Sequence, residues 1–153
     1  GKDLQARENM LRASFYAGEA FTRASVGYVH AIAHQFGALY NTPHGLANAI
    51  LLPKILRQYG STIESKMMEI AQYCEMPPAS DGSYATAVIN KIEALNDEMG
   101  IPQQLSSLKQ QDVGLIANMA YDEAHPDYPV PAFFERTDFK GVLEELLENV
   151  VAK

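Results

Sequence analysis

The chain has 153 residues, of which 47% are hydrophobic and 20% are charged, and its formal net charge is -7. This length suits one domain with a core of its own, and the composition is that of a globular protein rather than a disordered one. The negative charge repels phosphate backbones, and the apolar runs are shorter than the roughly 20 residues of a membrane span. We therefore expect neither nucleic acid nor a membrane as a partner, and the single cysteine, Cys74, favours a reducing, cytoplasmic location.

The N-terminal segment predicts an amphipathic helix. Asp3 is suited to cap it, and apolar or small residues then recur with a helical period at Leu4, Leu11, Phe15, Gly18 and Thr22. The glycine in this stripe would let a second helix cross closely. Because the sequence enters this helix almost at once and has no initiator methionine, we expect it to be part of a longer chain.

Six further segments follow the same helical period. They are expected at residues 25–40, 43–59, 61–74, 84–99, 110–121 and 137–150. Ser61 or Thr62 is expected to cap the fourth helix, and Thr137 or Asp138 the last, whose apolar stripe extends to Val150. Because no segment alternates with period two, the predicted fold class is all-α, a bundle of about seven helices.

Pro53 falls inside the third helical segment, where its ring removes a backbone hydrogen bond. We expect a kink at this point unless a neighbouring group satisfies the carbonyl that the proline leaves free. Residues 47–52, just before it, are apolar on nearly all sides, which predicts a helix buried over most of its surface.

Three of the four histidines, His30, His34 and His44, lie within fifteen positions of an otherwise apolar region. The first two are four residues apart and so share one face of a helix, while Pro43 suits the first turn of the next helix, which brings His44 from a second element. A single such histidine is usually a satisfied core residue, but three together suggest a metal or redox site. A zinc protease is excluded because its motif needs a Glu general base where Ala31 stands.

The same region resembles the signature of the iron-containing (type III) alcohol dehydrogenases. The resemblance rests on residues 27–37 (GYVHAIAHQFG), 43–45 (PHG) and 48–53 (NAILLP), and it extends to residues 17–21 and 100–102. Glycerol dehydrogenases and dehydroquinate synthases also place metal histidines in a helical C-terminal domain, but their flanking residues resemble this stretch less. The resemblance implies that residues 1–153 form a single helical, metal-binding C-terminal domain of the dehydroquinate synthase-like, iron-containing alcohol dehydrogenase fold.

The resemblance also implies roles for the three histidines. His30 and His44 match the residues that bind a divalent metal in the family, Fe2+ in most cases and Zn2+ or Mn2+ in others. The metal polarises the substrate oxygen as a Lewis acid. His34 matches a residue near the nicotinamide and the alcohol, where it orients the substrate or passes a proton. The complete enzyme would transfer hydride between NAD or NADP and a small alcohol or aldehyde, as a homo-oligomer.

Two parts of the family pattern are missing from this sequence. The family's other metal ligands form an Asp-x-x-x-His pattern upstream, and none precedes His30 here. No Gly-x-Gly occurs either, so we expect the N-terminal nucleotide-binding domain to be absent and the chain alone to be inactive. The alternative hypothesis is a stand-alone helical module that binds metal or a partner protein without catalysis.

The remaining residues of possible chemical interest have simpler interpretations. His125 stands where many family members carry Asn-Pro-Arg, and we interpret it as a loop residue rather than a ligand. Cys74 is expected to be a small buried hydrophobe on its helix. Asp122 and Glu123 are expected to lie on a solvated face.

Overall fold

The computed structural model describes residues 1–147 and is entirely helical over them, with seven α-helices and two short 3-10 helices. The α-helices are α1 (Leu4–Ala24), α2 (Tyr28–Tyr40), α3 (His44–Tyr59), α4 (Glu64–Tyr73), α5 (Tyr84–Glu98), α6 (Val113–Ala124) and α7 (Arg136–Glu144). This confirms the all-α prediction, while Val150 lies outside the described residues. None of the described helices is both long and apolar enough to cross a bilayer.

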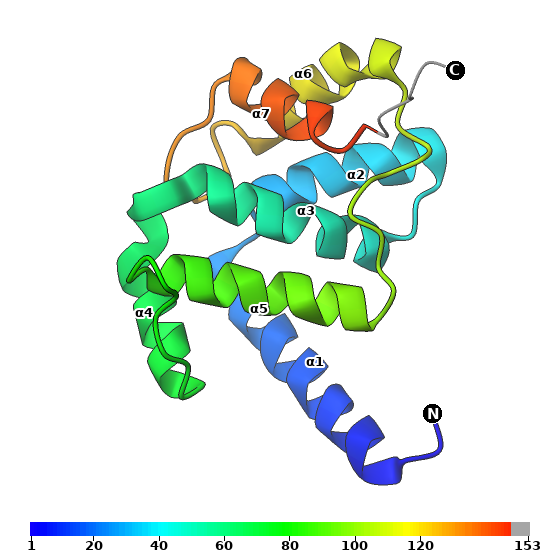
Figure 1. Ribbon diagram of the computed structural model, residues 1–153. Coiled ribbons are helices and arrows are strands. Elements are labelled where there is room, and N and C mark those ends of the chain that lie inside the picture. The colour runs from blue at the N-terminus through cyan, green and yellow to red at the C-terminus, as the bar shows by residue number, and fades with distance from the viewer. Residues whose placement is uncertain (148–153) are drawn as a thin grey trace, which may run out of the picture.

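Helices α2 and α3 occupy the centre of the molecule (Figure 1). α2 packs against α3 and α6, and α6 in turn packs against α7. On the other side α5 packs against α3 and α4, so α3 is enclosed between α2 and α5. This arrangement explains the apolar run predicted to be buried, in which Ala47, Ile50 and Leu51 are all nearly inaccessible to solvent.

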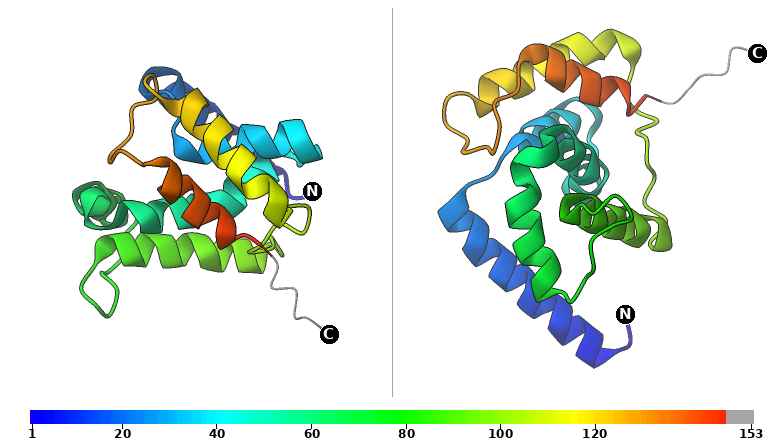
Figure 2. Two further views of the ribbon diagram at one scale, coloured as in Figure 1. Left: turned by 90° about the horizontal axis from the view of Figure 1, so that it is seen from above. Right: turned by 60° about the vertical axis from the view of Figure 1, so that its left-hand side comes forward.

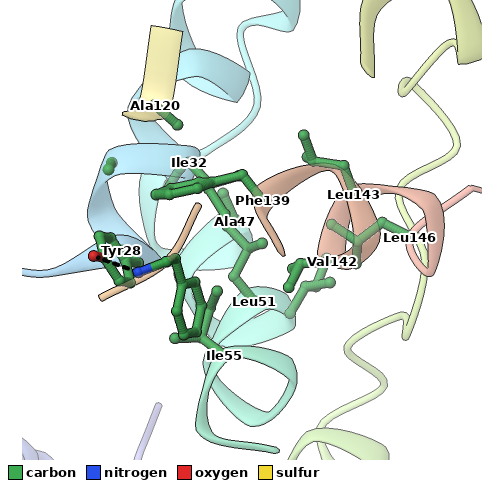
Figure 3. Close-up of a cluster of buried hydrophobic side chains, with 14 of the residues drawn as sticks. Tyr28, Ile32, Ala47, Leu51, Ile55, Ala120, Phe139, Val142, Leu143 and Leu146 are labelled. Carbon is green, nitrogen blue, oxygen red and sulfur yellow. Dashed lines mark hydrogen bonds between the residues drawn. The ribbon is translucent and has the colours of Figure 1, made fainter. Parts of the chain in front are cut away.

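The hydrophobic core lies between α2, α3, α6 and α7 (Figure 3). Its largest fully buried side chains include Ile32, Leu51, Phe139 and Leu143. Each such side chain contributes about 1.5–3 kcal/mol to folding relative to an exposed one. The core therefore holds together the same helices that carry the three clustered histidines.

Helix α1 extends away from this bundle (Figure 2). Asp3 caps it as predicted, because its Oδ1 accepts a hydrogen bond from the backbone N–H of Ala6 at 3.0 Å. The apolar stripe of α1 is open to solvent among the described residues, since no residue of α1 is buried and Leu11 and Phe15 are 73% and 67% exposed. A Cβ added at Gly18 would meet only the Phe21 ring, so no helix crosses there among the described residues.

Two predicted helix starts are also wrong. Residues Gly60–Ile63 form a 3-10 helix, so α4 begins at Glu64 and neither Ser61 nor Thr62 caps it. The N-cap of α7 is Glu135, whose backbone N–H donates to Asp138 Oδ2 at 2.8 Å in a capping box. The predicted cap Asp138 therefore acts from the third position of its helix rather than in front of it.

Helix α4 buries less of its surface than its sequence suggests. Only Met67 and Ala71 are buried, whereas Ile70 is 46% exposed. Cys74, predicted to be buried, is also exposed. The physical reason is that α4 lies at the margin of the bundle and, within residues 1–147, packs mainly on α5 and the adjoining 3-10 turn.

The backbone carbonyl that Pro53 leaves without a helical hydrogen bond is that of Ala49, and it has a hydrogen-bond donor from another helix. Four residues before the proline lies Ala49, and its carbonyl oxygen accepts a hydrogen bond from Asn96 Nδ2 of α5 at 2.8 Å. The predicted requirement for a neighbouring donor is thus met from a different helix. The bond ties α5 to the first half of α3, next to the histidine at its N-terminus.

His125 also links distant segments of the chain, because it is hydrogen-bonded to Tyr28 of α2. Its Nδ1 lies 3.0 Å from the carbonyl oxygen of Tyr121, which can only accept, so Nδ1 carries the proton. Nε2 therefore accepts from the Tyr28 hydroxyl at 2.8 Å, and that hydroxyl accepts from the Phe134 backbone N–H at 3.1 Å (Figure 3). His125 follows α6 directly, as predicted for a loop residue, but it is half-buried in an aromatic cluster rather than free in solvent.

We predict that Asn96→Ala lowers the free energy of unfolding by about 1–2 kcal/mol more than Asn90→Ala, because it leaves the Ala49 carbonyl unsatisfied. Asn90 lies on the exposed side of the same helix and undergoes the same change in helix propensity, and it loses only an exposed hydrogen bond from Arg57, which stays bonded to Glu93. Urea denaturation followed by circular dichroism measures both values. Equal stability of the two variants would show that this hydrogen bond contributes nothing.

We also predict that Tyr28→Phe costs about 1–3 kcal/mol of unfolding free energy, because it leaves His125 Nε2 and the Phe134 N–H without partners. The control is Tyr73→Phe, since Tyr73 is 94% exposed and loses a hydroxyl that water replaces. Its stability should stay within about 0.5 kcal/mol of the parent chain. The same denaturation experiment compares them, and a Tyr28→Phe chain as stable as the control would contradict the prediction.

Candidate functional site

The structure brings together the three histidines singled out in the sequence. His30 and His34 lie one turn apart on α2, and His44 is the first residue of α3. Their ring centroids are 5.3 Å apart for His30 and His44, 5.6 Å for His34 and His44, and 6.0 Å for His30 and His34. Three imidazoles from two helices thus meet at one point of the surface.

The turn between the two helices explains this meeting. Only residues 41–43 separate α2 from α3. Asn41 adopts a left-handed conformation with φ 52°, and its backbone N–H caps the carbonyls of Phe36 and Gly37. Asparagine tolerates this conformation better than most residues, so the chain can reverse here within a few residues. Pro43 then precedes the first turn of α3, where His44 lies.

His30 is the most enclosed member of the cluster. It is half-buried, and desolvation lowers its pKa below the ordinary value. The neighbouring imidazoles of His44 and His34 lower the pKa further, and the carboxylate of Glu123 partly opposes them. The uncharged form of His30 is therefore favoured, and only this form has a lone pair for a metal ion.

Asn48 orients His44 from one turn further along α3. Its Nδ2 donates to the backbone carbonyl of His44 at 2.8 Å and lies 3.1 Å from His44 Nε2. Because an amide nitrogen only donates, Nε2 must be the acceptor and must carry the lone pair of the ring. The other atom of this amide, Oδ1, is buried without a hydrogen-bond partner among the described residues. An acceptor left open beside the histidines suits a ligand that donates a hydrogen bond.

Glu123 joins the cluster from α6, which the sequence interpretation missed. It was expected on a solvated face, but its carboxylate accepts hydrogen bonds from His34 Nδ1 at 2.6 Å, Gln35 Nε2 at 2.6 Å and the Tyr128 hydroxyl at 2.9 Å. A signal for this was present in the sequence. Glu123 follows the buried Ala120 by three positions, which places it beside the face of α6 that meets α2.

An apolar hollow of about 380 Å³ opens beside the cluster. Its lining includes Phe21 of α1, Val26 before α2 and Leu52 of α3. His30 and Asn48 border the same hollow and are among the residues that bring polar groups to it. Small-molecule sites are typically apolar cavities of this order with a few polar groups that orient the ligand.

The histidines fit part of a metal site. Two imidazoles bound tetrahedrally to one ion at about 2.1 Å place their ring centroids about 5 Å apart, close to the 5.3 Å between His30 and His44. Within residues 1–147, however, no group of three or more His, Cys, Asp or Glu side chains is arranged to hold a metal ion. The described residues therefore bring two imidazoles to a separation compatible with one shared ion, with a third imidazole nearby, and do not form a complete donor set.

Comparison with known proteins identifies the family. A family model described as the Fe-containing alcohol dehydrogenase family, C-terminal, matches residues 1–147. The 1,3-propanediol dehydrogenase of Citrobacter freundii is 43% identical over 131 residues, which cover 82% of this chain and 33% of that protein. Alcohol dehydrogenase 4 of Saccharomyces cerevisiae (strain YJM789) is 38% identical over 135 residues, which cover 85% of this chain and 34% of that protein.

The fold points to the same family. The crystal structure of a 1,3-propanediol oxidoreductase matches with a TM-score of 0.86 and 35% sequence identity, over 95% of this chain and 39% of that one. The chain spans about a third of the length of the curated relatives named above. The family match over residues 1–147 shows that the chain belongs to the iron-containing alcohol dehydrogenase family and corresponds to its helical C-terminal domain.

Proposed function

We propose that this chain supplies the metal-binding part of the active site of an NAD- or NADP-dependent alcohol dehydrogenase. His30 and His44 are the metal ligands, and His34 is the catalytic residue beside the substrate. The observation that carries the proposal is the convergence of these three imidazoles, with centroids 5.3–6.0 Å apart, at the start of α3. Family membership supports it, because the family is named for its iron and its alcohol substrates.

The donor set suits a divalent first-row ion, for which Fe2+ is the first candidate and Zn2+ or Mn2+ the alternatives. When bound, such an ion supplies Lewis-acid polarisation of the alcohol oxygen. Catalytic sites normally use three protein ligands, and His30 and His44 are two. We propose that the others come from the upstream Asp-x-x-x-His of the family pattern, and that the nucleotide is held by a separate domain. The chain by itself is then inactive.

The residues around the two ligands prepare them for this role. Burial favours the uncharged form of His30, which is the form that binds a metal ion. Asn48 places the lone pair of the neutral His44 ring on Nε2, and a metal ion bound at this atom would replace the hydrogen bond from Asn48 Nδ2.

The apolar hollow beside His30 is proposed to receive the carbon chain of a small alcohol or aldehyde. Its volume of about 380 Å³ lies near the lower end of the range for small-molecule sites. Phe21 and Val26 would contact the carbon chain, while the open Oδ1 of Asn48 is an acceptor for a hydroxyl group. The relative named for 1,3-propanediol acts on a substrate of this size class. The enzyme is proposed to work as a cytoplasmic homo-oligomer.

A second candidate function is a module that binds a partner protein without catalysis. The exposed apolar residues of α1, among them Leu4, Leu11 and Phe15, favour it, since a surface of this kind is normally covered. The two candidates differ in one respect. Only the dehydrogenase requires the three histidines to be intact.

We predict that His30→Ala and His44→Ala each remove both the metal and the activity of the complete enzyme, because each deletes a ligand. His34→Ala is expected to keep the metal and to lower kcat at least about 10-fold, since proton transfer by a positioned side chain contributes on the order of 100-fold or more. Elemental analysis and steady-state kinetics with a small primary alcohol measure the two effects. His34→Ala serves as the matched control for metal content, being the same substitution in the same cluster.

His125→Ala is unsuitable as a control, because His125 is bonded to Tyr28 and its loss affects stability. The ligand assignment would be wrong if the full-length His44→Ala enzyme still held one tightly bound iron or zinc per chain. A partner-binding module without catalysis would instead show no alcohol oxidation in any variant, whatever its metal content.

A further inference from the structure

We propose that Glu123 is a positioning residue of this site: it holds the proton of His34 on Nδ1 and so leaves Nε2 as the atom that accepts the hydroxyl proton of the alcohol. The inference rests on the proposed catalytic role of His34 and adds a residue from another helix to it. Glu123 and His34 are 89 positions apart and meet only because α6 packs on α2.

The hydrogen bond between the two residues determines the tautomer. Glu123 Oε1 lies 2.6 Å from His34 Nδ1, a length typical of a charge-assisted hydrogen bond. An ionised carboxylate has no hydrogen to donate, so Nδ1 must carry the proton. In the neutral ring the lone pair then lies on Nε2.

Two neutral donors hold the carboxylate in place. The Tyr128 hydroxyl donates to Oε1 at 2.9 Å, and Gln35 Nε2 donates to Oε2 at 2.6 Å. Gln35 is only 6% exposed, and the same nitrogen also donates to the Ala31 carbonyl at 3.0 Å. Its amide therefore cannot turn over without losing that bond, and it offers Glu123 hydrogens only.

The neighbouring acidic residue shows that this arrangement is not a general property of the helix face. Asp122 is 66% exposed and pairs with Arg136 at 2.5 Å. Glu123 is 28% exposed, and among the ion pairs of residues 1–147 it takes part only in the one with His34. Its charge is thus directed at the imidazole rather than at a lysine or arginine.

This geometry suits proton transfer during alcohol oxidation. In alcohol oxidation the hydroxyl proton would pass to Nε2 of His34, while NAD(P)+ held by the separate nucleotide domain would take the hydride from the carbon, so that the carbon–oxygen double bond of the aldehyde forms. His34 then carries a positive charge, which the Glu123 carboxylate stabilises. A carboxylate that orients and supports a catalytic histidine in this way acts through the ring and does not touch the substrate.

The decisive variant is Glu123→Gln in the complete enzyme. Because Gln35 presents only hydrogens, the new amide places its oxygen at the Oε2 position and its NH2 group toward His34, and the Tyr128 hydroxyl turns from donor to acceptor. Nδ1 then has to accept, and the proton of the neutral ring moves to Nε2. The number of hydrogen bonds between α2 and α6 is kept, so a purely structural role would lose nothing.

We expect Glu123→Gln to keep its metal content and melting temperature, to lower kcat about 10- to 100-fold and to change KM less than about threefold. Nitrogen-15 NMR of the histidine rings in this chain should show His34 changing from the Nδ1–H to the Nε2–H tautomer. The double variant with His34→Ala should be no slower than His34→Ala alone. The matched control is Asp122→Asn, the same change at the next residue, with kcat within about twofold of the parent enzyme.

Several outcomes would overturn the inference. If Glu123→Gln keeps the parent kcat, or if His34 in this variant is still protonated on Nδ1, Glu123 has only a structural role as a hydrogen-bond link between α6 and α2. Loss of the metal in Glu123→Gln would instead make His34 a ligand. If His34→Ala is as active as the parent, the proposed function of His34 fails and this inference with it. If His34→Ala is slow and Glu123→Gln is not, only the role of Glu123 fails.

Discussion

The packing of α2 against α3 is the interaction on which the rest of the structure depends. It buries Ile32 and Leu51 in the core, and the three-residue turn between the helices sets His44 beside His30. α3 carries a proline in its interior, and it keeps its helical course because Asn96 of α5 satisfies the Ala49 carbonyl. A contact from outside the pair thus permits a helix that the local sequence alone would disfavour.

The candidate site and the hydrophobic core lie on different sides of helix α2. Along α2 the residues Ile32 and Phe36 face the interior, while His30 and His34 lie at its edge. Gln35 links the two, since it is buried and yet donates to the carboxylate from α6. The histidines therefore stand on a rigid element, which suits a site whose ligands must be held within a fraction of an ångström.

Helix α1 shows that hydrophobic periodicity predicts a helix but does not predict whether its apolar face is buried. The period correctly predicts the helix, because it reflects how side chains are spaced along any helical backbone. It does not say what covers the apolar stripe, and within the described residues the stripe is open to solvent. The same reasoning applies to Ile70 on the marginal helix α4.

The all-helical class, the helix at each predicted position within residues 1–147 and the pairing of His30 with His34 on one face follow from local spacing, which the sequence by itself determines. The role of His44 as a metal ligand and the dehydrogenase chemistry come from the resemblance of its motif to a known family. Tertiary structure decided what joins distant segments: Glu123 to His34, 89 positions apart, and Tyr28 to His125, 97 positions apart. Such bonds depend on which helix faces pack together, and a single sequence carries no direct record of that packing.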